Sequence, residues 1–446
     1  MRQEELVSPA LGIRARAVTI AAAVLVSSLA AGAQISLATA VDLAQKSSPA
    51  IRSAQASVIR AAGAVEEAKD AYYPNFTAGA GPGYAYGYPL GYPSLVNANS
   101  TSLVISFSQP DYIRAARSGL NSARLALQDA QQQVALDVSL DYAQLDYDLR
   151  EMAALDEEKS YAHNLVSIEQ ERVGAGVDPR VQELQAELTA AQLEQKRMHI
   201  EDDADEMRQK IAHLTGLPAA GLTTVSSSIP SVPNPAEAGS QFGEYAARNS
   251  PGVAAAYASA KSKFYTAFGD ERQNYRPLIT FGAQYSLFQK FAGYTEYFRG
   301  FQYNNFSLGV QINVPIFDAG RRAKARESAA DAVRAQADAD AARNTLSEQT
   351  LLMRRTVREV AAQQRVAQLQ SELAQEQLKA VDTELANGSG NPNGQAVTPR
   401  DAQQAHIQER ERYLDMLDAD FSLLKVQLNL LRVTGHLDSW IHSSLK

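Results

Sequence analysis

The two halves of this 446-residue chain repeat one order of sequence signals. Five marked sites recur in the same order, as the pairs Ser48-Pro49 and Ser250-Pro251, Tyr73-Pro74 and Arg276-Pro277, Gln109-Pro110 and Val314-Pro315, Asp178-Pro179-Arg180 and Thr398-Pro399-Arg400, and Thr215-Gly216 and Thr434-Gly435. The spacing between matched prolines is nearly constant until the last pair, because the second copy gains the turn-forming stretch 387–395 (NGSGNPNGQ). The repeat predicts a fold built twice from the same elements.

The first residues have the composition of a secretory signal peptide. Arg14 and Arg16 precede an apolar run at 18–29, and a small-x-small motif ends at Ala33. The run is shorter than the roughly 20 apolar residues that span a bilayer. We therefore predict cleavage between Ala33 and Gln34, with a retained membrane anchor as the alternative.

The remaining chain divides into two repeats and a linker. We place the first repeat at 34–216, the linker at 217–236, the second repeat at 237–435 and a C-terminal tail at 436–446. The linker carries four prolines, which favour extended backbone over helix. Beyond the signal peptide no apolar run is long enough for a transmembrane helix, so a chain that enters a bilayer must do so as strands.

Four segments alternate apolar and polar residues, as strands with one apolar face do. The pattern is regular at 304–316 and 277–287, shorter at 101–109, and least regular at the glycine-rich segment 74–88. Aromatic residues crowd the loops between paired strands, most densely at 288–303. Alternation over about ten residues with aromatics at the strand ends is typical of outer-membrane barrel strands. A soluble sheet with one buried face is the alternative.

Each repeat continues into a long helical hairpin. Residues 111–171 contain no proline and one glycine, which predicts a helix about 90 Å long at 1.5 Å per residue. The second copy offers the same pattern at 318–385 and 401–433. Apolar residues follow a coiled-coil rhythm at Leu127, Val134, Val138, Leu145, Leu149 and Met152, and on the returning helix at Leu184, Leu188, Leu193 and Ile200. A polar, alanine-rich hairpin of this kind needs neighbours to bury its apolar stripe.

The strands predict a barrel that several copies of the chain share. A four-stranded sheet in lipid leaves two edges of unpaired backbone groups, at several kcal/mol each, so copies must close one barrel together. Two copies give eight strands, whose interior is filled by side chains. Three copies give twelve strands and an open lumen. The predicted fold class is mainly α with a β-barrel part: long α-helical hairpins form a tunnel, and each subunit adds four strands to a shared transmembrane β-barrel.

Composition and motifs argue against an enzyme and against a nucleic-acid partner. The formal net charge is −8, and the chain has no cysteine and six histidines without metal-ligand spacing. Phosphate-binding loops, Rossmann fingerprints and the G-x-S-x-G motif are absent from the sequence. The acidic run at 201–206 is better explained as a solvated helix face than as a cation site. We expect no catalytic residue, no cofactor and no bound metal.

The same residues resemble the TolC-like outer-membrane efflux protein (OEP) family over nearly the whole mature chain. The matching pieces are 35–41 with Ser48-Pro49, 314–321 (VPIFDAGR) at a strand-to-helix corner, 172–176 (RVGAG) at a helix turn, and the two Thr-Gly pairs. Their order, found twice, makes the resemblance specific. It implies a homotrimer in outer-membrane lipid, with a twelve-stranded barrel and a periplasmic helical tunnel. It also implies docking to a periplasmic adaptor (membrane fusion) protein and an inner-membrane pump.

In this family the hairpin turns form the periplasmic tip, where the adaptor docks and an aperture closes. The resemblance therefore predicts docking contacts at Arg172, Val173, Gly174, Gly176, Asp178 and Arg400. The second turn departs from the family pattern, because the 387–395 insertion replaces its glycine motif. There Asp401 is the aperture candidate, and an exposed aspartate that favours a helix start is the alternative. The corner at 109–111 lacks the glycine that the second copy has at Gly320.

These observations favour the outer-membrane channel subunit of a tripartite efflux or type I secretion system, acting as a passive duct. A soluble periplasmic coiled-coil scaffold or adaptor is the first alternative, and it explains the helices but not four alternating strands. A periplasmic hydrolase is the second, and the sequence offers it neither a nucleophile nor a metal set. The substrate does not follow from the sequence.

Overall fold

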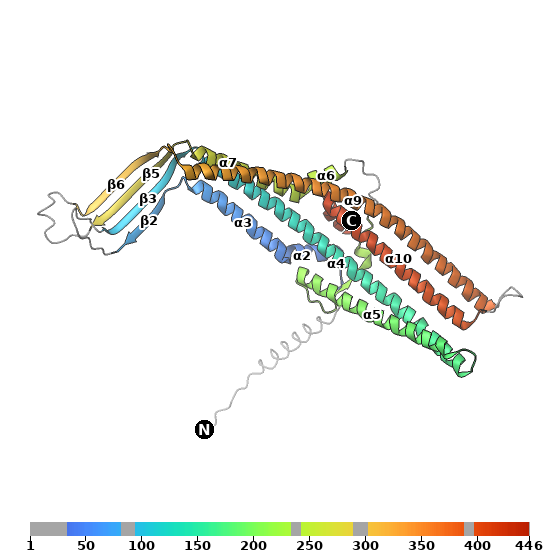
Figure 1. The fold of residues 1–446 in the computed structure, drawn as a ribbon. Coiled ribbons are helices and arrows are strands. Elements are labelled where there is room, and N and C mark those ends of the chain that lie inside the picture. The colour runs from blue at the N-terminus through green and yellow to red at the C-terminus, as the bar shows by residue number, and fades with distance from the viewer. Residues whose placement is uncertain (1–33, 82–93, 233–241, 289–301, 388–396, 446) are drawn as a thin grey trace, which may run out of the picture. The chain divides into compact units, whose positions relative to one another are not determined.

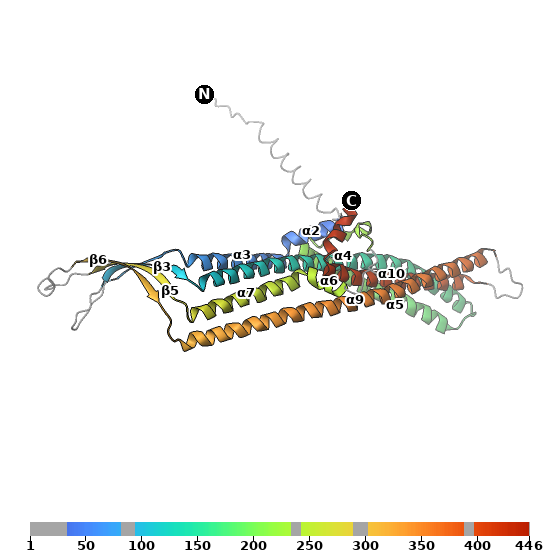
Figure 2. The same ribbon diagram turned by 90° about the horizontal axis from the view of Figure 1, so that it is seen from above.

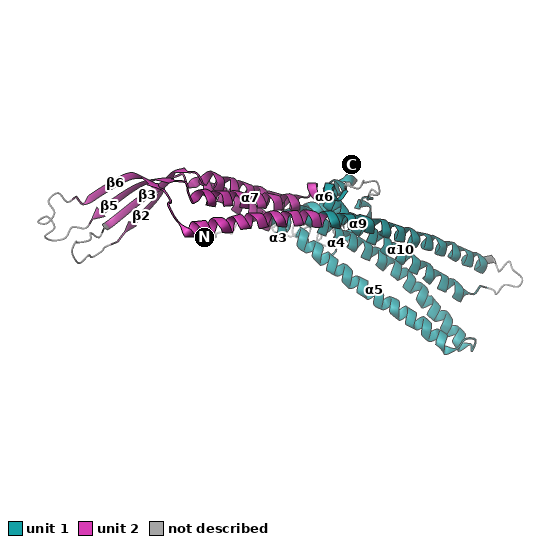
Figure 3. Ribbon diagram, turned by 45° about the horizontal axis from the view of Figure 1, so that its top comes forward, with its two compact units in different colours: residues 1–52, 130–246, 347–446 teal, residues 53–129, 247–346 magenta. Residues whose placement is uncertain are grey.

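The computed structural model describes residues 34–81, 94–232, 242–288, 302–387 and 397–445. These residues form two compact units (Figure 3). Unit 1 takes its residues from 1–52, 130–246 and 347–446, and unit 2 from 53–129 and 247–346. The predicted signal peptide with Ala33, most of the aromatic strand-connecting loops and the 387–395 insertion beyond its first residue lie outside the described residues.

Unit 2 contains one antiparallel sheet of four strands (Figure 1). Its strands are β2 (Asn75–Ala80), β3 (Ser94–Ser106), β5 (Leu278–Phe288) and β6 (Asn304–Asn313), in the spatial order β2-β3-β5-β6. The central β3–β5 pair joins the two repeats, with Ser100 opposite Ala283. β2 and β6 are the two edge strands of this sheet.

Two strand boundaries differ from the sequence prediction. β3 begins at Ser94 rather than near residue 101, because its Asn- and Ser-rich first half also pairs with β2 and β5. A register shift between Leu103 and Ile105 marks an irregularity near its other end. β6 ends at Asn313 rather than 316, just before Pro315, which has no N–H for a ladder. Within the described residues β2 ends at Ala80, and the predicted continuation at 82–88 lies outside them.

Each strand of unit 2 is continuous with a helix. α3 (Pro49–Asp70) leads into β2, β3 leads into α4 (Gln109–Gly174), α7 (Pro251–Gln273) leads into β5, and β6 leads into α9 (Ala319–Asn387). Within unit 2 these helices lie in the same order as their strands (Figure 2). α4 begins two positions before the predicted 111, because Pro110 is tolerated in the first turn of a helix.

Small and polar residues join the helices of unit 2. The Ser262 hydroxyl donates to the carbonyl oxygen of Ala115 at 2.7 Å, which holds α7 against α4. Asp270 on α7 accepts hydrogen bonds from Tyr112 on α4 and Ser328 on α9. A Cβ atom at Gly269 would lie 2.7 Å from the Tyr112 ring. Close helix approach in this unit therefore depends on residues without bulky side chains.

Unit 1 anchors the N-terminus and the linker to α4. Its elements are β1 (Gln34–Ile35), α2 (Leu37–Ser47), α5 (Arg180–Thr215), β4 (Thr223–Thr224), a 3-10 turn (Ser226–Ser228), α6 (Phe242–Asn249), α10 (Pro399–Thr434), α11 (Leu437–Ile441) and a final 3-10 turn (His442–Leu445). β1 and β4 pair in parallel. The buried Tyr142 hydroxyl on α4 donates to Ile35 O at 2.7 Å and accepts from the Val225 backbone N–H at 2.7 Å. The predicted extended linker is thus fastened to a helix.

The core of unit 1 packs α4 against α5 and α10. It contains Ala154, Leu155, Ala162 and Leu165 of α4, Ala186, Ala190 and Leu193 of α5, and Ile407, Leu414 and Leu417 of α10. The stripe predicted on α4 is buried at Val134, Val138 and Leu145. Leu184 and Leu188 of the stripe predicted on α5 are 50% and 58% exposed, as expected of a stripe that needs neighbours to bury it. Alanines form the inner face instead, because small residues let the helices approach more closely.

Among the described residues, no helix combines the length and the apolar character needed to cross a membrane.

Candidate docking end of the helical hairpins

The turn between α4 and α5 is a short glycine-containing loop in unit 1. α4 ends at Gly174, and Gly176 has φ +73°, a left-handed conformation that glycine adopts without strain. The Val177 N–H donates to Arg172 O at 2.9 Å, which satisfies a carbonyl of the last helical turn. The Arg172 guanidinium donates to an Asp178 carboxylate oxygen at 2.5 Å. This pair closes the loop across its base.

Arg400, near the start of α10, connects the second hairpin to this turn. Its Nε lies 2.9 Å from Glu169 Oε1 on α4, and its Nη2 donates to Gln182 Oε1 on α5 at 2.9 Å. Its Nη1 lies 3.8 Å from Asp178 Oδ2. One guanidinium therefore contacts α4, the turn and α5 together. A planar fork of five donors suits such a position better than the ammonium group of a lysine.

Two charges at this end carry shifted pKa values. The hydrogen bond from Arg172, with a further contribution from Arg400, lowers the pKa of the Asp178 carboxyl. The same hydrogen bond raises the pKa of Arg172. Both shifts favour the ionised pair, so the turn keeps its closing contact at neutral pH. No group of His, Asp and Glu that could hold a metal ion occurs in the described part of the chain.

Asp401 takes part in the start of its own helix. Thr398 and Asp401 form a capping box: the Thr398 N–H donates to Asp401 Oδ2 at 2.9 Å, and the Asp401 N–H donates to the Thr398 hydroxyl at 3.4 Å. Hydrogen bonds from Thr398 lower the pKa of Asp401. Asp401 is exposed, and its engaged carboxylate matches the helix-start alternative. An aperture role for this residue stays a prediction.

The structure brings three of the six predicted docking residues into one contact network. Arg172, Asp178 and Arg400 are linked by ion pairs, while Val173 and Gly174 lie at the end of α4 beside them. Glu169 and Gln182, the partners of Arg400, were not predicted from the sequence. Both lie in helices rich in acids and glutamines, so no local signal sets them apart.

An exposed apolar row runs along α5 from this turn and includes Leu184 and Leu188 of the predicted stripe. Val177, Val181, Leu184 and Leu188 are 50–63% exposed. The last three have helical spacing and share one face of α5. The candidate docking end therefore presents glycines and apolar side chains outward, while Arg172, Asp178 and Arg400 are held in ion pairs.

The comparisons with known proteins agree with this geometry. Residues 40–217 match the model of the outer membrane efflux protein family. No curated protein sequence matches the chain. The outer-membrane channel OprN has a similar structure, with TM-score 0.72, 16% identity, and coverage of 91% of this chain and 90% of that chain. The CmeC outer membrane channel of Campylobacter jejuni is also similar, with TM-score 0.70 and 13% identity, and the match covers 90% of this chain and 86% of that chain.

A third similar structure is the outer membrane protein VceC of Vibrio cholerae, with TM-score 0.68 and 17% identity over 90% of this chain and 96% of that chain. The fold is therefore that of outer-membrane channels. The family match covers the first repeat and agrees with the resemblance found in the sequence. The predicted resemblance to this family and the predicted fold class are confirmed.

Proposed function

We propose that this chain is one subunit of a homotrimeric, passive, non-enzymatic outer-membrane duct in a tripartite efflux or type I secretion system. One observation carries the proposal: a four-stranded sheet with free edges at β2 and β6 continues directly into long helices. A soluble scaffold would use the helices but would have no need of this sheet.

The exposed face of β6 supports a place in hydrocarbon. Phe306, Leu308, Val310 and Ile312 lie on one face of this strand and are 62–65% exposed. The intervening residues on the other face are polar or glycine. A continuous apolar row of this kind is unfavourable in water and favourable against lipid, while the opposite face suits a wet lumen.

The sheet edges support closure by further copies. In lipid, the unpaired N–H and C=O groups of β2 and β6 have no water to bind, at a cost of several kcal/mol each. Pairing β6 of one copy with β2 of the next removes both edges. Three copies then give twelve strands, which is enough for an open lumen.

The helices of unit 1 also support burial between copies. α5 exposes Val181, Leu184 and Leu188, and α9 exposes a second row at Val366, Leu369 and Leu373, which are 48–58% exposed. Both rows have helical spacing. Packing one against the other in a neighbouring copy would bury two apolar stripes that a single chain leaves in water.

The turn between α4 and α5 is the proposed contact for a periplasmic adaptor and, through it, an inner-membrane pump. Its exposed glycines and Val177 offer a surface without bulky charged groups, and the Arg172–Asp178 pair keeps the turn in one shape. A preformed surface of this kind lowers the cost of ordering on binding. Asp401 is the proposed aperture residue.

The proposal is tested by placing a lysine on either face of β6. We expect Val310→Lys to abolish heat-modifiable trimers in the outer membrane and single-channel conductance in planar bilayers, because a lysine at mid-bilayer on the lipid face costs about 2–4 kcal/mol. The matched control is Gln311→Lys, one residue away on the opposite face, which should assemble and conduct. If the parent chain and both variants are all water-soluble monomers, the proposed duct is wrong and the scaffold alternative stands.

A further inference from the structure

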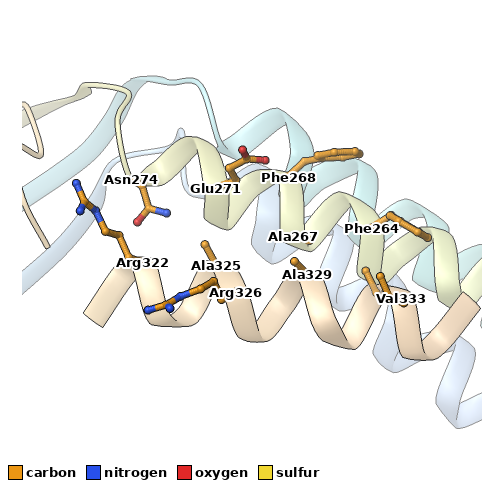
Figure 4. A pocket seen from close by; sticks show the side chains of 11 residues that line it. Phe264, Ala267, Phe268, Glu271, Asn274, Arg322, Ala325, Arg326, Ala329 and Val333 are labelled. Carbon is orange, nitrogen blue, oxygen red and sulfur yellow. The ribbon is translucent and has the colours of Figure 1, made fainter. Parts of the chain in front are cut away.

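A groove of about 730 Å³ lies between α7 and α9 in unit 2 (Figure 4). It is lined from α7 by Phe264, Ala267, Phe268, Glu271 and Asn274, and from α9 by Arg322, Ala325, Arg326, Ala329, Ala332 and Val333. Alanines occupy most of the seam between the two helices, so the two backbones form its floor. A groove of this volume suits a drug-sized molecule.

The groove has a polar end and an apolar end. Figure 4 shows Asn274 and Arg322 at one end, next to the start of β5, and Phe264 and Val333 at the other. Arg326 lies one helical turn from Arg322 on the same face of α9. A ligand that fits this layout carries its polar group at one end of an apolar body.

The charge of the polar end favours an anion. Among the described residues, neither Arg322 nor Arg326 has a carboxylate within ion-pair distance, although their neighbours Arg321 and Lys324 pair with Asp318 and Glu327. The Arg322 guanidinium lies over the Phe317 ring at 4.9 Å, which leaves its N–H edge available. Glu271 is the one acidic side chain in the lining. Two guanidiniums against one carboxylate give a net positive site.

An unsatisfied acceptor lies in the same end of the groove. Asn274 ends α7, and its side-chain Oδ1 atom is buried without a hydrogen-bond partner. A buried acceptor of this kind costs about 1–3 kcal/mol until a donor reaches it. A ligand with an N–H or O–H group near its anionic end would satisfy this atom.

The groove belongs to one subunit. β5 and β6 are neighbours in the sheet, and the helices α7 and α9 that line the groove continue them. A further copy that pairs with the free edge of β6 would meet α9 on its other flank. Closure of the barrel therefore leaves this seam between two helices of the same chain.

We propose that this groove binds a small anionic amphiphile, whose carboxylate or sulfate contacts Arg322 and Arg326 and whose apolar body lies toward Val333. The site goes beyond the proposed passive duct, because a passive duct does not need a binding site for a solute. Arg side chains bind carboxylates in a fork of two hydrogen bonds, and the apolar lining contributes through burial. The inference does not require the trimer.

The test uses the full-length mature protein in phosphatidylcholine nanodiscs and a fluorescent probe, dansyl-aminoundecanoic acid, with empty nanodiscs as the blank. We expect the acid to bind at least tenfold more tightly than its methyl ester. The double variant Arg322→Gln/Arg326→Gln should lose that tenfold preference. Arg334→Gln, an exposed arginine on the same helix that pairs with Asp338 at 3.8 Å, is the matched control and should bind like the parent protein.

A second variant tests the groove by its volume rather than by its charge. Ala329→Phe fills the middle of the groove from an exposed position, so it should weaken both the acid and the ester while the protein still assembles. Equal binding of acid and ester, or unchanged acid binding in the double arginine variant, overturns the site. Loss of probe binding when phosphatidylglycerol replaces phosphatidylcholine assigns the groove to a membrane lipid and overturns the small amphiphile. This test measures probe binding and not channel activity. Failure of the proposed duct function would therefore appear only in the trimer and conductance measurements on the β6 variants.

Discussion

Arg400 at the start of α10 and Glu169 near the end of α4 form an ion pair with 2.9 Å between Nε and Oε1. Glu169 is fully buried, and its second oxygen, Oε2, has no hydrogen-bond partner in the described structure. The pair therefore joins two hairpins from different repeats through a carboxylate that water does not reach. A buried carboxylate depends on its cation more strongly than an exposed one does.

Arg400→Ala should lower the free energy of unfolding of unit 1 by about 1–3 kcal/mol, because Glu169 loses its counter-charge while it stays buried. Adding Glu169→Gln to the variant should restore part of this loss, since a neutral amide tolerates burial better. Hydrogen exchange around the turn, together with thermal unfolding, measures both effects.

Arg412→Ala is the matched control, because Arg412 pairs with Asp415 on the exposed surface of the same helix. Such pairs contribute about 0–1 kcal/mol. Equal destabilisation by the two arginine substitutions would contradict a special role for the buried pair.

A second buried acid makes stability depend on pH. Glu158 on α4 is 1% exposed, and burial raises its pKa to about 7, with a further rise from Glu411 on α10. Lys196 on α5 and Arg410 on α10 lower it by less. The folded chain therefore holds a proton at neutral pH that the unfolded chain releases near pH 4.5.

Since the pKa is raised in the folded state, the stability linked to Glu158 is complete below about pH 4.5 and is lost as the pH rises through about 7. Glu158→Gln should remove this loss. At pH 8 the variant should be more stable than the parent by about 1–3 kcal/mol, and at pH 5 the two should be similar. Thermal midpoints measured from pH 5 to 8 test this, and parallel curves for the two proteins would show that Glu158 does not titrate in the folded chain.

Much of the fold could be predicted because short local motifs mark where its helices begin and end. The Ser-Pro and Thr-Gly pairs mark helix ends, and each closing glycine, Gly216 and Gly435, has φ +77°. Alternation placed β5 within a residue of its observed bounds. It failed for the first half of β3, where pairing with neighbours, rather than polarity, makes the strand.

The docking end was predictable where glycines define a turn, and not where distant helices meet. Gly176 marks the loop from sequence alone. The contact between Arg400 and Glu169 depends on how two hairpins pack, which no local pattern encodes. The exposure of Leu184 and Leu188 agrees with the expectation that the apolar stripe needs neighbours, because Ala186 and Ala190 fill the inner position within one chain.

The capping box gives a prediction that separates two roles of Asp401. Thr398→Ala and Asp401→Ala should each cost about 0.5–2 kcal/mol, because each removes part of one reciprocal cap. If Asp401 also lines an aperture, its substitution alone should change cation selectivity in planar bilayers. Equal selectivity for the two variants would leave Asp401 with the capping role only.

Two glycines on helices of unit 2 should respond in opposite directions to the same added methyl group. At Gly269 a Cβ atom would lie 2.7 Å from the Tyr112 ring, so Gly269→Ala should destabilise the unit by about 1–3 kcal/mol through overpacking. At Gly63, within α3, no atom lies within 4 Å of the added carbon. Gly63→Ala should therefore stabilise by about 0.5–1 kcal/mol, because alanine loses less backbone entropy in a helix. Thermal midpoints that fall for both variants would place a neighbouring chain against Gly63, where a single subunit leaves open space.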